Sequence, residues 1–331
     1  MNVPGPHVVV TDPNLVPLRA ELEAALPPGT EVRWLDDAAP DAVEAAVAEA
    51  DVLVSQAVPP ELARAAKRLR LVHAPGAGTE RITVAGLPPG AQVANTFHHE
   101  DAIAEHVVAA SILLRRGFLR QDSALRNGIW ESATYDRQVP WPGALGGATI
   151  GFVGFGHIGA TAWDRLRAFG ARGIAVTRRG RVDPEAGLAW AGIRDRLPEL
   201  LAESDVVVVS IPLSEETTGL IGAAELAKAG PDAVLINVGR GPLVDEEALY
   251  EALRDGVLGA AAIDVWYQYP TAGKTAEPSR FPFHELENVL MTPHSSGIAR
   301  QTYTRRVADI AANIRRLAAG EPVQNVVAVA G

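Results

Sequence analysis

The stretch ATIGFVGFGHIGATAWDRLRAFGARGIAVTRR, residues Ala148–Arg179, decides the fold of this chain. It begins with Thr149–Val153, a short apolar run of strand type, and a turn rich in glycine follows. Ala160–Phe169 then has its apolar residues at helical spacing, and Gly173–Thr177 is a second apolar run. Strand, glycine turn, helix and strand in this order form one unit of a doubly wound α/β fold, which is the fold class that the sequence predicts.

The glycines of the turn, Gly154, Gly156 and Gly159, are spaced as G-x-G-x-x-G. In a dinucleotide-binding fold the first glycine permits the tight turn, the second lets the backbone approach a pyrophosphate, and the third lets the helix pack closely on the strand. The phosphates then bind N–H groups at the N-terminus of the helix. Glycine-rich loops also occur as plain turns, but the strand before this one and the helix after it favour dinucleotide binding.

The residues that end the second strand, Thr177, Arg178 and Arg179, indicate which dinucleotide binds. Folds that bind NAD usually carry Asp or Glu about 20 residues after the glycines to bind the ribose hydroxyls, whereas an Arg there suits the 2′-phosphate of NADP. This chain has a hydroxyl, two guanidiniums and no carboxylate at that point. The sequence therefore favours NADP over NAD. The alternative is that the arginines form a solvated strand end.

Composition sets the class of protein. With 331 residues the chain is long enough for two domains, each with its own core. The net charge of −10 argues against binding to nucleic acid or anionic membranes, so local positive groups must meet any anionic substrate. The sequence has no cysteine, which excludes disulfides and cysteine metal sites. No apolar run approaches about 18 residues and no signal peptide is visible, so we expect a cytoplasmic protein.

The first hundred residues alternate short apolar strands with alanine-rich amphipathic segments, which predicts a parallel sheet covered by helices. The expected strands are Val8–Val10, Glu31–Leu35, Val52–Val54, Leu71–Ala74 and the run around Val93, and the expected helices are Leu15–Leu26, Asp41–Ala50 and Glu61–Arg68. Such sheets bind ligands at the carboxyl ends of their strands. The loop that contains Ala77 and Gly78 lies at such an end. It either offers N–H groups to a substrate carboxylate or is a tight turn.

The rest of the chain predicts a second α/β domain. After the long helix Asp101–Arg116 and the dinucleotide unit, the expected strands are Asp205–Ile211, Ala233–Asn237, Ala260–Val265 and Val289–Met291, and the expected helices are Gly222–Ala229 and Glu246–Leu253. The closing segment Gln301–Ala318 has the apolar periodicity of a helix. We expect this helix to pack back on the first domain.

Two residues at strand ends have the chemistry for hydride transfer between a nicotinamide and a 2-oxo or 2-hydroxy acid. That reaction needs a fixed cation for the carboxylate and the carbonyl, and a proton donor that titrates near neutral pH. Arg240 follows one apolar strand, and His294 follows another. The alternatives are a surface arginine after a turn and a histidine that caps a helix or fills the core.

Five ordered motifs resemble the D-isomer-specific 2-hydroxyacid dehydrogenases. They are GFVGFGHIG at 151–159, SIPLSEETTGLI at 210–221, LINVGRGPLVDEEAL at 235–249, AAIDVW at 261–266 and NVLMTPHSSG at 288–297. The resemblance covers essentially the whole chain. It implies a discontinuous flavodoxin-like substrate domain, residues 1–104 plus 291–331, with an inserted Rossmann cofactor domain, residues 105–290. It also implies a homodimer formed through the cofactor domain.

By that resemblance, Arg240 is the substrate-binding arginine and His294 the proton donor, while Ala77 and Gly78 receive the substrate carboxylate. Asp264 would hold the amide of the nicotinamide. The predicted cofactor-binding residues include the strand end with its two arginines. They are Gly154, Phe155, Gly156, His157, Ile158, Gly159, Thr177, Arg178, Arg179, Ile211, Pro212, Thr217, Val238, Asp264 and Gly297.

One position departs from the family. Where the family has glutamate before the proline of D-V-F-x-x-E-P, this chain has Tyr269, which we place in the catalytic set with Arg240 and His294. A phenol can orient an imidazole, but it brings no negative charge to stabilise the protonated ring. We therefore expect a lower pKa for His294 than beside a glutamate. Formate dehydrogenases of the superfamily carry a neutral glutamine there, so oxidation of formate or phosphite stays an alternative.

His98 and His99 precede the long helix, and the resemblance places them facing the substrate. Beside Arg240 they would accommodate a second anionic group, such as a carboxylate, phosphate or phosphonate. The alternative is two loop histidines in solvent. Because the two are adjacent rather than separated by the spacing of metal ligands, no metal site is predicted.

The sequence as a whole predicts an NADP-preferring 2-oxoacid reductase that works as a D-2-hydroxyacid dehydrogenase, with NAD as the lesser cofactor and a small acid as substrate. A different class also stays open, because the C-terminal-binding-protein corepressors use the same fold as a dinucleotide-sensing interaction module. The acidic composition of this chain favours the enzyme over such a module.

Overall fold

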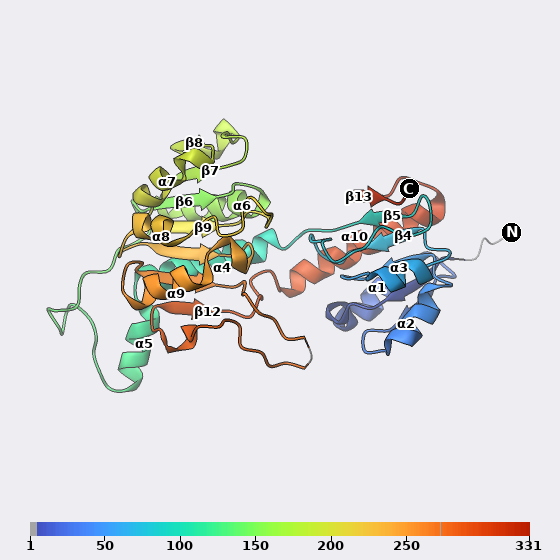
Figure 1. The fold of residues 1–331 in the computed structure, drawn as a ribbon, viewed down its shortest axis with the longest axis horizontal. Coiled ribbons are helices and arrows are strands. Elements are labelled where there is room, and N and C mark those ends of the chain that lie inside the picture. Colours follow the sequence, from blue (N-terminus) through green and yellow to red (C-terminus); the bar gives the residue numbers. More distant parts are fainter. Residues whose placement is uncertain (1–4, 272) are drawn as a thin grey trace. The chain divides into compact units, whose positions relative to one another are not determined.

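The computed structural model describes residues 5–271 and 273–331, which form two compact units (Figure 1). Unit 1 consists of Met1–His98 and Ile298–Gly331, and unit 2 of His99–Gly297. Each unit is a largely parallel sheet with helices on its faces, which confirms the predicted α/β fold class.

The boundaries between the units differ from those expected at 104/105 and 290/291. Helix α4, Glu100–Arg115, packs against α6, His157–Leu166, and therefore belongs to unit 2 from its first turn. Strand β12, Val289–Met291, pairs with β11, Ala260–Ile263, so the loop after β12 also lies in unit 2. The boundaries between the units depend on which sheet or helix each whole element packs against. The positions of the motifs in the sequence do not show this packing.

The sheet of unit 1 has the strand order β13-β5-β4-β3-β1-β2. Its strands are β1 (His7–Val10), β2 (Glu31–Trp34), β3 (Val52–Val54), β4 (Leu71–His73), β5 (Gln92–Ala94) and β13 (Val326–Val329). All pairs are parallel except that of β13 with β5. Strand β13 was not predicted from the sequence, because its valines are mostly exposed and do not alternate as in a half-buried strand.

The helices of unit 1 cover both faces of its sheet. They are α1 (Arg19–Ala25), α2 (Pro40–Val47), α3 (Pro60–Ala65) and α10 (Arg300–Ala319). The single helix expected over Leu15–Leu26 is instead a 3-10 helix, Pro13–Leu18, followed by α1, because Pro17 lacks the N–H that an α-helix interior requires. As expected, α10 packs on this unit, where it contacts α1 and buries Ile310 and Ile314.

The sheet of unit 2 has the strand order β12-β11-β10-β9-β6-β7-β8, and its pairs are all parallel. Besides β11 and β12, its strands are β6 (Thr149–Val153), β7 (Arg172–Val176), β8 (Trp190–Gly192), β9 (Val206–Val209) and β10 (Val234–Asn237). After β8 the chain crosses to the other side of β6 to form β9. The strand order thus reverses beside β6, and such a switch point is where open α/β sheets bind ligands.

Two layers of helices cover the sheet of unit 2. Helices α4 and α6 pack on one face, and α7 (Leu197–Glu203), α8 (Ala223–Ala229) and α9 (Glu246–Arg254) on the other. Helix α5 (Phe118–Arg126) has no buried residue. Helix α7 and strand β8 were not predicted from the sequence; both are short, and few residues separate them. Within the described residues, none of the helices has the length and apolar character needed to cross a membrane.

Candidate active site

The turn between β6 and α6 has the geometry of a dinucleotide-binding turn. Gly154 has a φ of +92°, which favours glycine, and a Cβ there would lie 2.5 Å from Cγ2 of Ile211. A Cβ on Gly159 would lie 2.9 Å from the carbonyl oxygen of Gly154. Gly156 caps α6, whose first residues include His157 and Ile158, and Phe155 completes the turn. The turn therefore fits a pyrophosphate at the N-terminus of α6.

The other predicted cofactor residues of unit 2 follow neighbouring strands at the same edge of the sheet. Ile211, Pro212 and Thr217 come after β9, Val238 after β10, Asp264 after β11 and Gly297 after β12. The Thr217 hydroxyl donates to the Pro212 carbonyl at 2.9 Å and accepts from the Ser214 N–H at 2.8 Å, which folds the loop after β9 into a closed turn.

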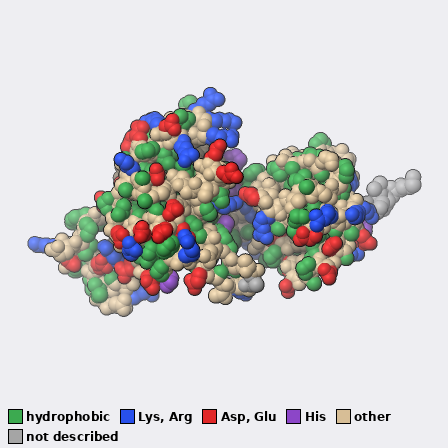
Figure 2. Space-filling model, viewed as in Figure 1, with side chains coloured by type: hydrophobic (Ala, Val, Ile, Leu, Met, Phe, Trp, Pro, Cys, Tyr) green, Lys and Arg blue, Asp and Glu red, His purple; other side chains and the backbone are tan. Residues whose placement is uncertain are grey.

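The arginines after β7 are part of a larger basic group than the sequence indicated. Thr177, Arg178 and Arg179 follow β7, and both guanidiniums are exposed. The Thr177 N–H donates to the Gly192 carbonyl at 2.8 Å, so Arg194, just past β8, lies at the same edge. Figure 2 shows Lys and Arg side chains gathered at this end of unit 2. Arg194 was not among the predicted cofactor residues, because strand β8 before it was not predicted.

Asp264 holds the loop that carries His294. The residue is 1% exposed, and its carboxylate accepts hydrogen bonds from the Thr292 hydroxyl at 2.6 Å, from the Ser295 N–H at 2.9 Å, and from both the N–H and the hydroxyl of Ser296. These bonds stabilise a loop in which His294 has a φ of +55°, an uncommon conformation for a residue other than glycine. The sequence did not predict this positioning role.

Tyr269 hydrogen-bonds to the imidazole of His294. The phenol oxygen lies 3.0 Å from Nδ1 of His294 and accepts from the Trp266 N–H at 3.1 Å. When the ring is neutral, the phenol donates to Nδ1, and the ring proton is then on Nε2. When the ring is protonated, the phenol accepts from Nδ1–H. Tyr269 can therefore orient the ring in both states, and Nε2 is the nitrogen left for a ligand.

The electrostatic surroundings of His294 disfavour its protonated form. Loss of solvent around the ring lowers its pKa from the ordinary value of 6.5; Asp264 opposes this shift and the positive charge of Arg240 adds to it. Loss of solvent likewise raises the pKa of Tyr269, which keeps the phenol neutral at physiological pH. The sequence analysis compared His294 with an imidazole beside a glutamate, and that comparison stays a prediction.

Arg240 is fixed by the backbone just after β10. The Asn237 side chain donates to the Arg240 carbonyl at 3.0 Å and accepts from the Gly239 N–H at 3.1 Å. The guanidinium Nη1 donates to the Gly239 carbonyl at 2.8 Å. Unit 2 thus brings together a held guanidinium, an oriented imidazole and the dinucleotide turn.

In unit 1, the loop Gly76–Gly78 is held by its carbonyl groups. The Gly76 carbonyl accepts from the Thr96 N–H at 3.3 Å, that of Ala77 from the Asn95 side chain at 2.8 Å, and that of Gly78 from the Gln56 side chain at 2.8 Å. Because a trans peptide directs its N–H opposite to its C=O, the N–H groups of Ala77 and Gly78 point away from these partners. Consecutive N–H groups of this kind suit an anion such as a carboxylate.

The two adjacent histidines lie in different units. His98 has a φ of +70°, and its Nε2 lies 2.8 Å from the Asp309 carboxylate of α10 in unit 1. His99 is the N-cap of α4 in unit 2, where a Cβ on Gly297 would lie 3.1 Å from the His99 Cβ. The ring of His98 is therefore engaged by a carboxylate.

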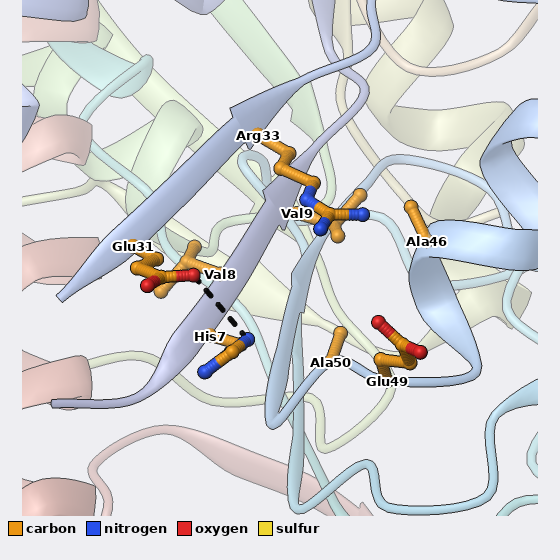
Figure 3. Close-up of a pocket in the computed structure, with 8 residues that line it drawn as sticks. All are labelled: His7, Val8, Val9, Glu31, Arg33, Ala46, Glu49 and Ala50. Atoms are coloured by element: carbon orange, nitrogen blue, oxygen red, sulfur yellow. Dashed lines mark ion pairs between the residues drawn. The ribbon is translucent and has the colours of Figure 1, made fainter. Parts of the chain in front are cut away.

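A small cavity of unit 1 lies away from the loops described above. Its volume is about 10 Å³, room for one water molecule, and Figure 3 shows its lining with the 3.8 Å ion pair of His7 and Glu31. These two residues begin β1 and β2, so the cavity is at the amino ends of the strands and is not a substrate site. Within residues 5–271 and 273–331, we find no group of three or more His, Asp or Glu placed to hold a metal ion.

The chain is similar to known dehydrogenases and reductases over most of its length. It is 34% identical to D-3-phosphoglycerate dehydrogenase of Mycobacterium leprae, a match that covers 93% of this chain and 57% of that protein. It is 32% identical to glyoxylate reductase of Korarchaeum cryptofilum, with 89% and 88% covered. The chain thus spans little more than half the length of the phosphoglycerate dehydrogenases that it matches.

Solved structures show the same fold. A D-lactate dehydrogenase from Lactobacillus jensenii, solved with NAD+, superimposes with a TM-score of 0.79 at 25% identity, covering 97% of this chain and 99% of that one. A D-isomer specific 2-hydroxyacid dehydrogenase from a Polaromonas species gives a TM-score of 0.80 at 27% identity, covering 98% and 100%. Residues 108–296, which carry the dinucleotide turn, Arg240 and His294, match the family model described as the NAD binding domain of the D-isomer specific 2-hydroxyacid dehydrogenases. The chain therefore belongs to the D-isomer specific 2-hydroxyacid dehydrogenase family, as its motifs indicated.

Proposed function

We propose that this protein is an NADPH-preferring 2-oxoacid reductase, which converts a small 2-oxo acid to the D-2-hydroxy acid. The observation that carries the proposal is the pairing of His294 with Tyr269, on a loop fixed by Asp264, in the unit that also holds Arg240 and the dinucleotide turn. The nicotinamide nucleotide, when bound, supplies the hydride.

The chain's own residues then hold the acid and move one proton. The guanidinium of Arg240 binds the acid and polarises its carbonyl, where negative charge develops. His294 donates a proton from Nε2 to the carbonyl oxygen, since Tyr269 is bound to Nδ1. In unit 1, the N–H groups of Ala77 and Gly78 bind the carboxylate.

The test is steady-state oxidation of NADPH and NADH with glyoxylate, hydroxypyruvate, phenylpyruvate and oxaloacetate, and reduction of NADP+ and NAD+ with formate and phosphite. We expect turnover of at least one 2-oxo acid, with NADPH preferred. Turnover of formate or phosphite alone would replace the proposal with a donor-oxidising dehydrogenase. Dinucleotide binding without turnover of any of these compounds would favour the sensing module.

Replacing both Arg178 and Arg179 with Ser is expected to reverse the cofactor preference. Each arginine can make charge-assisted hydrogen bonds to a 2′-phosphate, so kcat/KM with NADPH should fall by about 10- to 100-fold while that with NADH is unchanged. Arg181→Ser is the matched control, because this exposed arginine follows in the same turn. An equal loss with both nucleotides would show that the arginines support the fold rather than select the cofactor.

The missing glutamate predicts an unusual pH profile for 2-oxo acid reduction. Only the fraction with protonated His294 can donate a proton, so kcat/KM falls as pH rises through the pKa of the ring. Because that pKa lies below 6.5, we expect the fall on the acid side of neutrality. Tyr269→Glu should move the fall to higher pH, since a carboxylate favours the protonated ring, while Tyr269→Phe should not. A wild-type profile that stays flat until well above neutral pH would contradict this prediction.

We also propose a homodimer formed through unit 2. Helix α5 and the segment after it extend from the unit in Figure 1 and expose apolar side chains, with exposed fractions of 60% for Ile129, 61% for Trp130, 68% for Tyr135 and 85% for Trp141. A second copy could cover this surface symmetrically. Sedimentation velocity should show twice the monomer mass.

The cytoplasmic location stays a prediction from the sequence.

A further inference from the structure

The carboxyl edge of the unit 1 sheet contains a cation, Arg306 of α10, to which the sequence gave no role. Its Nε donates to the Phe97 carbonyl at 2.9 Å, and its guanidinium lies 5.2 Å from the ring centre of Tyr303. A Cβ built on Gly76 would lie 3.8 Å from Nη1 and 4.0 Å from Cζ of Arg306. A backbone acceptor and an aromatic ring therefore hold this guanidinium beside the loop whose N–H groups suit a carboxylate.

The neighbouring histidine, His98, already has a carboxylate partner. Asp309, one turn further along α10, accepts from the Thr96 hydroxyl at 2.6 Å and lies 2.8 Å from Nε2 of His98. An anion that approached His98 would compete with this carboxylate. Arg306 keeps its charge at every physiological pH and presents a planar fork of donors that matches carboxylate and phosphate groups. The charge and the donor geometry of Arg306 therefore suit the second anionic group that the sequence analysis assigned to the histidines.

We propose that Arg306 is a specificity-determining residue that binds a second anionic group of the substrate. The preferred substrates are then 2-oxo acids that carry a carboxylate, phosphate or phosphonate in addition to the carboxylate beside the carbonyl. The N–H groups of Ala77 and Gly78 receive one anionic group, and the guanidinium receives the other. The inference rests on the proposed function and names the substrate class of that same site. The chain's net charge of −10 makes such a local cation necessary for a dianionic substrate.

The experiment compares Arg306→Met with the wild-type protein on two sets of acids. Oxaloacetate and phosphonopyruvate carry a second anionic group; glyoxylate, hydroxypyruvate and phenylpyruvate do not. We expect the variant to lose about 10- to 100-fold in kcat/KM on the first set, mainly through KM, because a charge-assisted pair is lost, and to change little on the second. On the first set, kcat/KM of Arg306→Lys should lie between the values of the wild type and of Arg306→Met, since an ammonium keeps the charge without the planar fork.

Arg300→Met is the matched control, because Arg300 lies on the same helix with a side chain that is 78% exposed. It removes the same charge from the chain and should leave both sets of acids unaffected. Thermal unfolding and NADPH binding of Arg306→Met should match the wild type. An equal loss on both sets would overturn the proposal, since Arg306 would then bind the shared carboxylate or support the fold.

A direct binding measurement separates this inference from the proposed function. If the wild-type protein reduces no 2-oxo acid, the proposed function fails, and calorimetric titration of malonate and phosphonoacetate into the protein with NADP+ decides about the anion site. Binding that Arg306→Met weakens about 10-fold or more would still support the site. Binding that is equal in both proteins, or no binding to the wild type, would overturn it.

Discussion

Replacing His294 with Asn is expected to lower kcat for 2-oxo acid reduction by about 10²- to 10⁴-fold, the contribution typical of a general acid. Asn is the substitution of choice because His294 has a φ of +55°, and asparagine tolerates the left-handed region better than most residues. The loop is held by bonds from Thr292, Ser295 and Ser296 to Asp264, none of which uses the side chain of His294. The loop should therefore keep its conformation.

The measurement combines turnover with a nucleotide-binding titration. NADPH affinity of the His294→Asn protein should equal that of the wild type, because the dinucleotide turn is built from β6 and α6. His284→Asn is the matched control: this histidine is exposed, precedes β12 and should be replaceable without loss of activity. A His294→Asn protein with nearly wild-type kcat would remove His294 from the catalytic role.

Replacing Arg240 with Met is expected to lower kcat/KM by about 10²- to 10³-fold, as for loss of a group that stabilises developing negative charge. Met keeps much of the side-chain volume without the charge. The turn itself should persist, since Asn237 bonds to the backbone of Gly239 and Arg240. The loss should be seen with every 2-oxo acid, in contrast to the selective effect expected at Arg306.

A second readout distinguishes an electrostatic role of Arg240 from a structural one. The positive charge of Arg240 lowers the pKa of His294, so its removal should raise that pKa. The fall of residual activity with rising pH should then occur at higher pH in Arg240→Met than in the wild type. In Arg240→Lys, which keeps the charge, the fall should stay near the wild-type position. A large loss of activity with an unmoved pH profile in Arg240→Met would indicate that Arg240 supports the fold.

The sequence predicted features that are encoded within a single strand, turn or helix. The dinucleotide turn is one, because a Cβ on Gly154 would collide with Ile211 and a Cβ on Gly159 with the Gly154 carbonyl. The fully buried strands β6 and β9 are another, since strands covered on both faces are continuous apolar runs. The positions of Arg240 and His294 after strands followed from the same patterns. Elements without such a pattern, β8 and β13, were not predicted.

Contacts between residues far apart in the chain were decided only by the tertiary structure. The carboxylate of Asp264 reaches the His294 loop, His98 pairs with Asp309 across 211 positions, and Arg306 lies beside Gly76. Each depends on how a strand end or a helix is placed by packing on the rest of its unit. Local periodicity and spacing describe the geometry within one element. They carry no information on which distant side chain will meet a loop, so the charges around His294 and the cation of unit 1 became visible only in the fold.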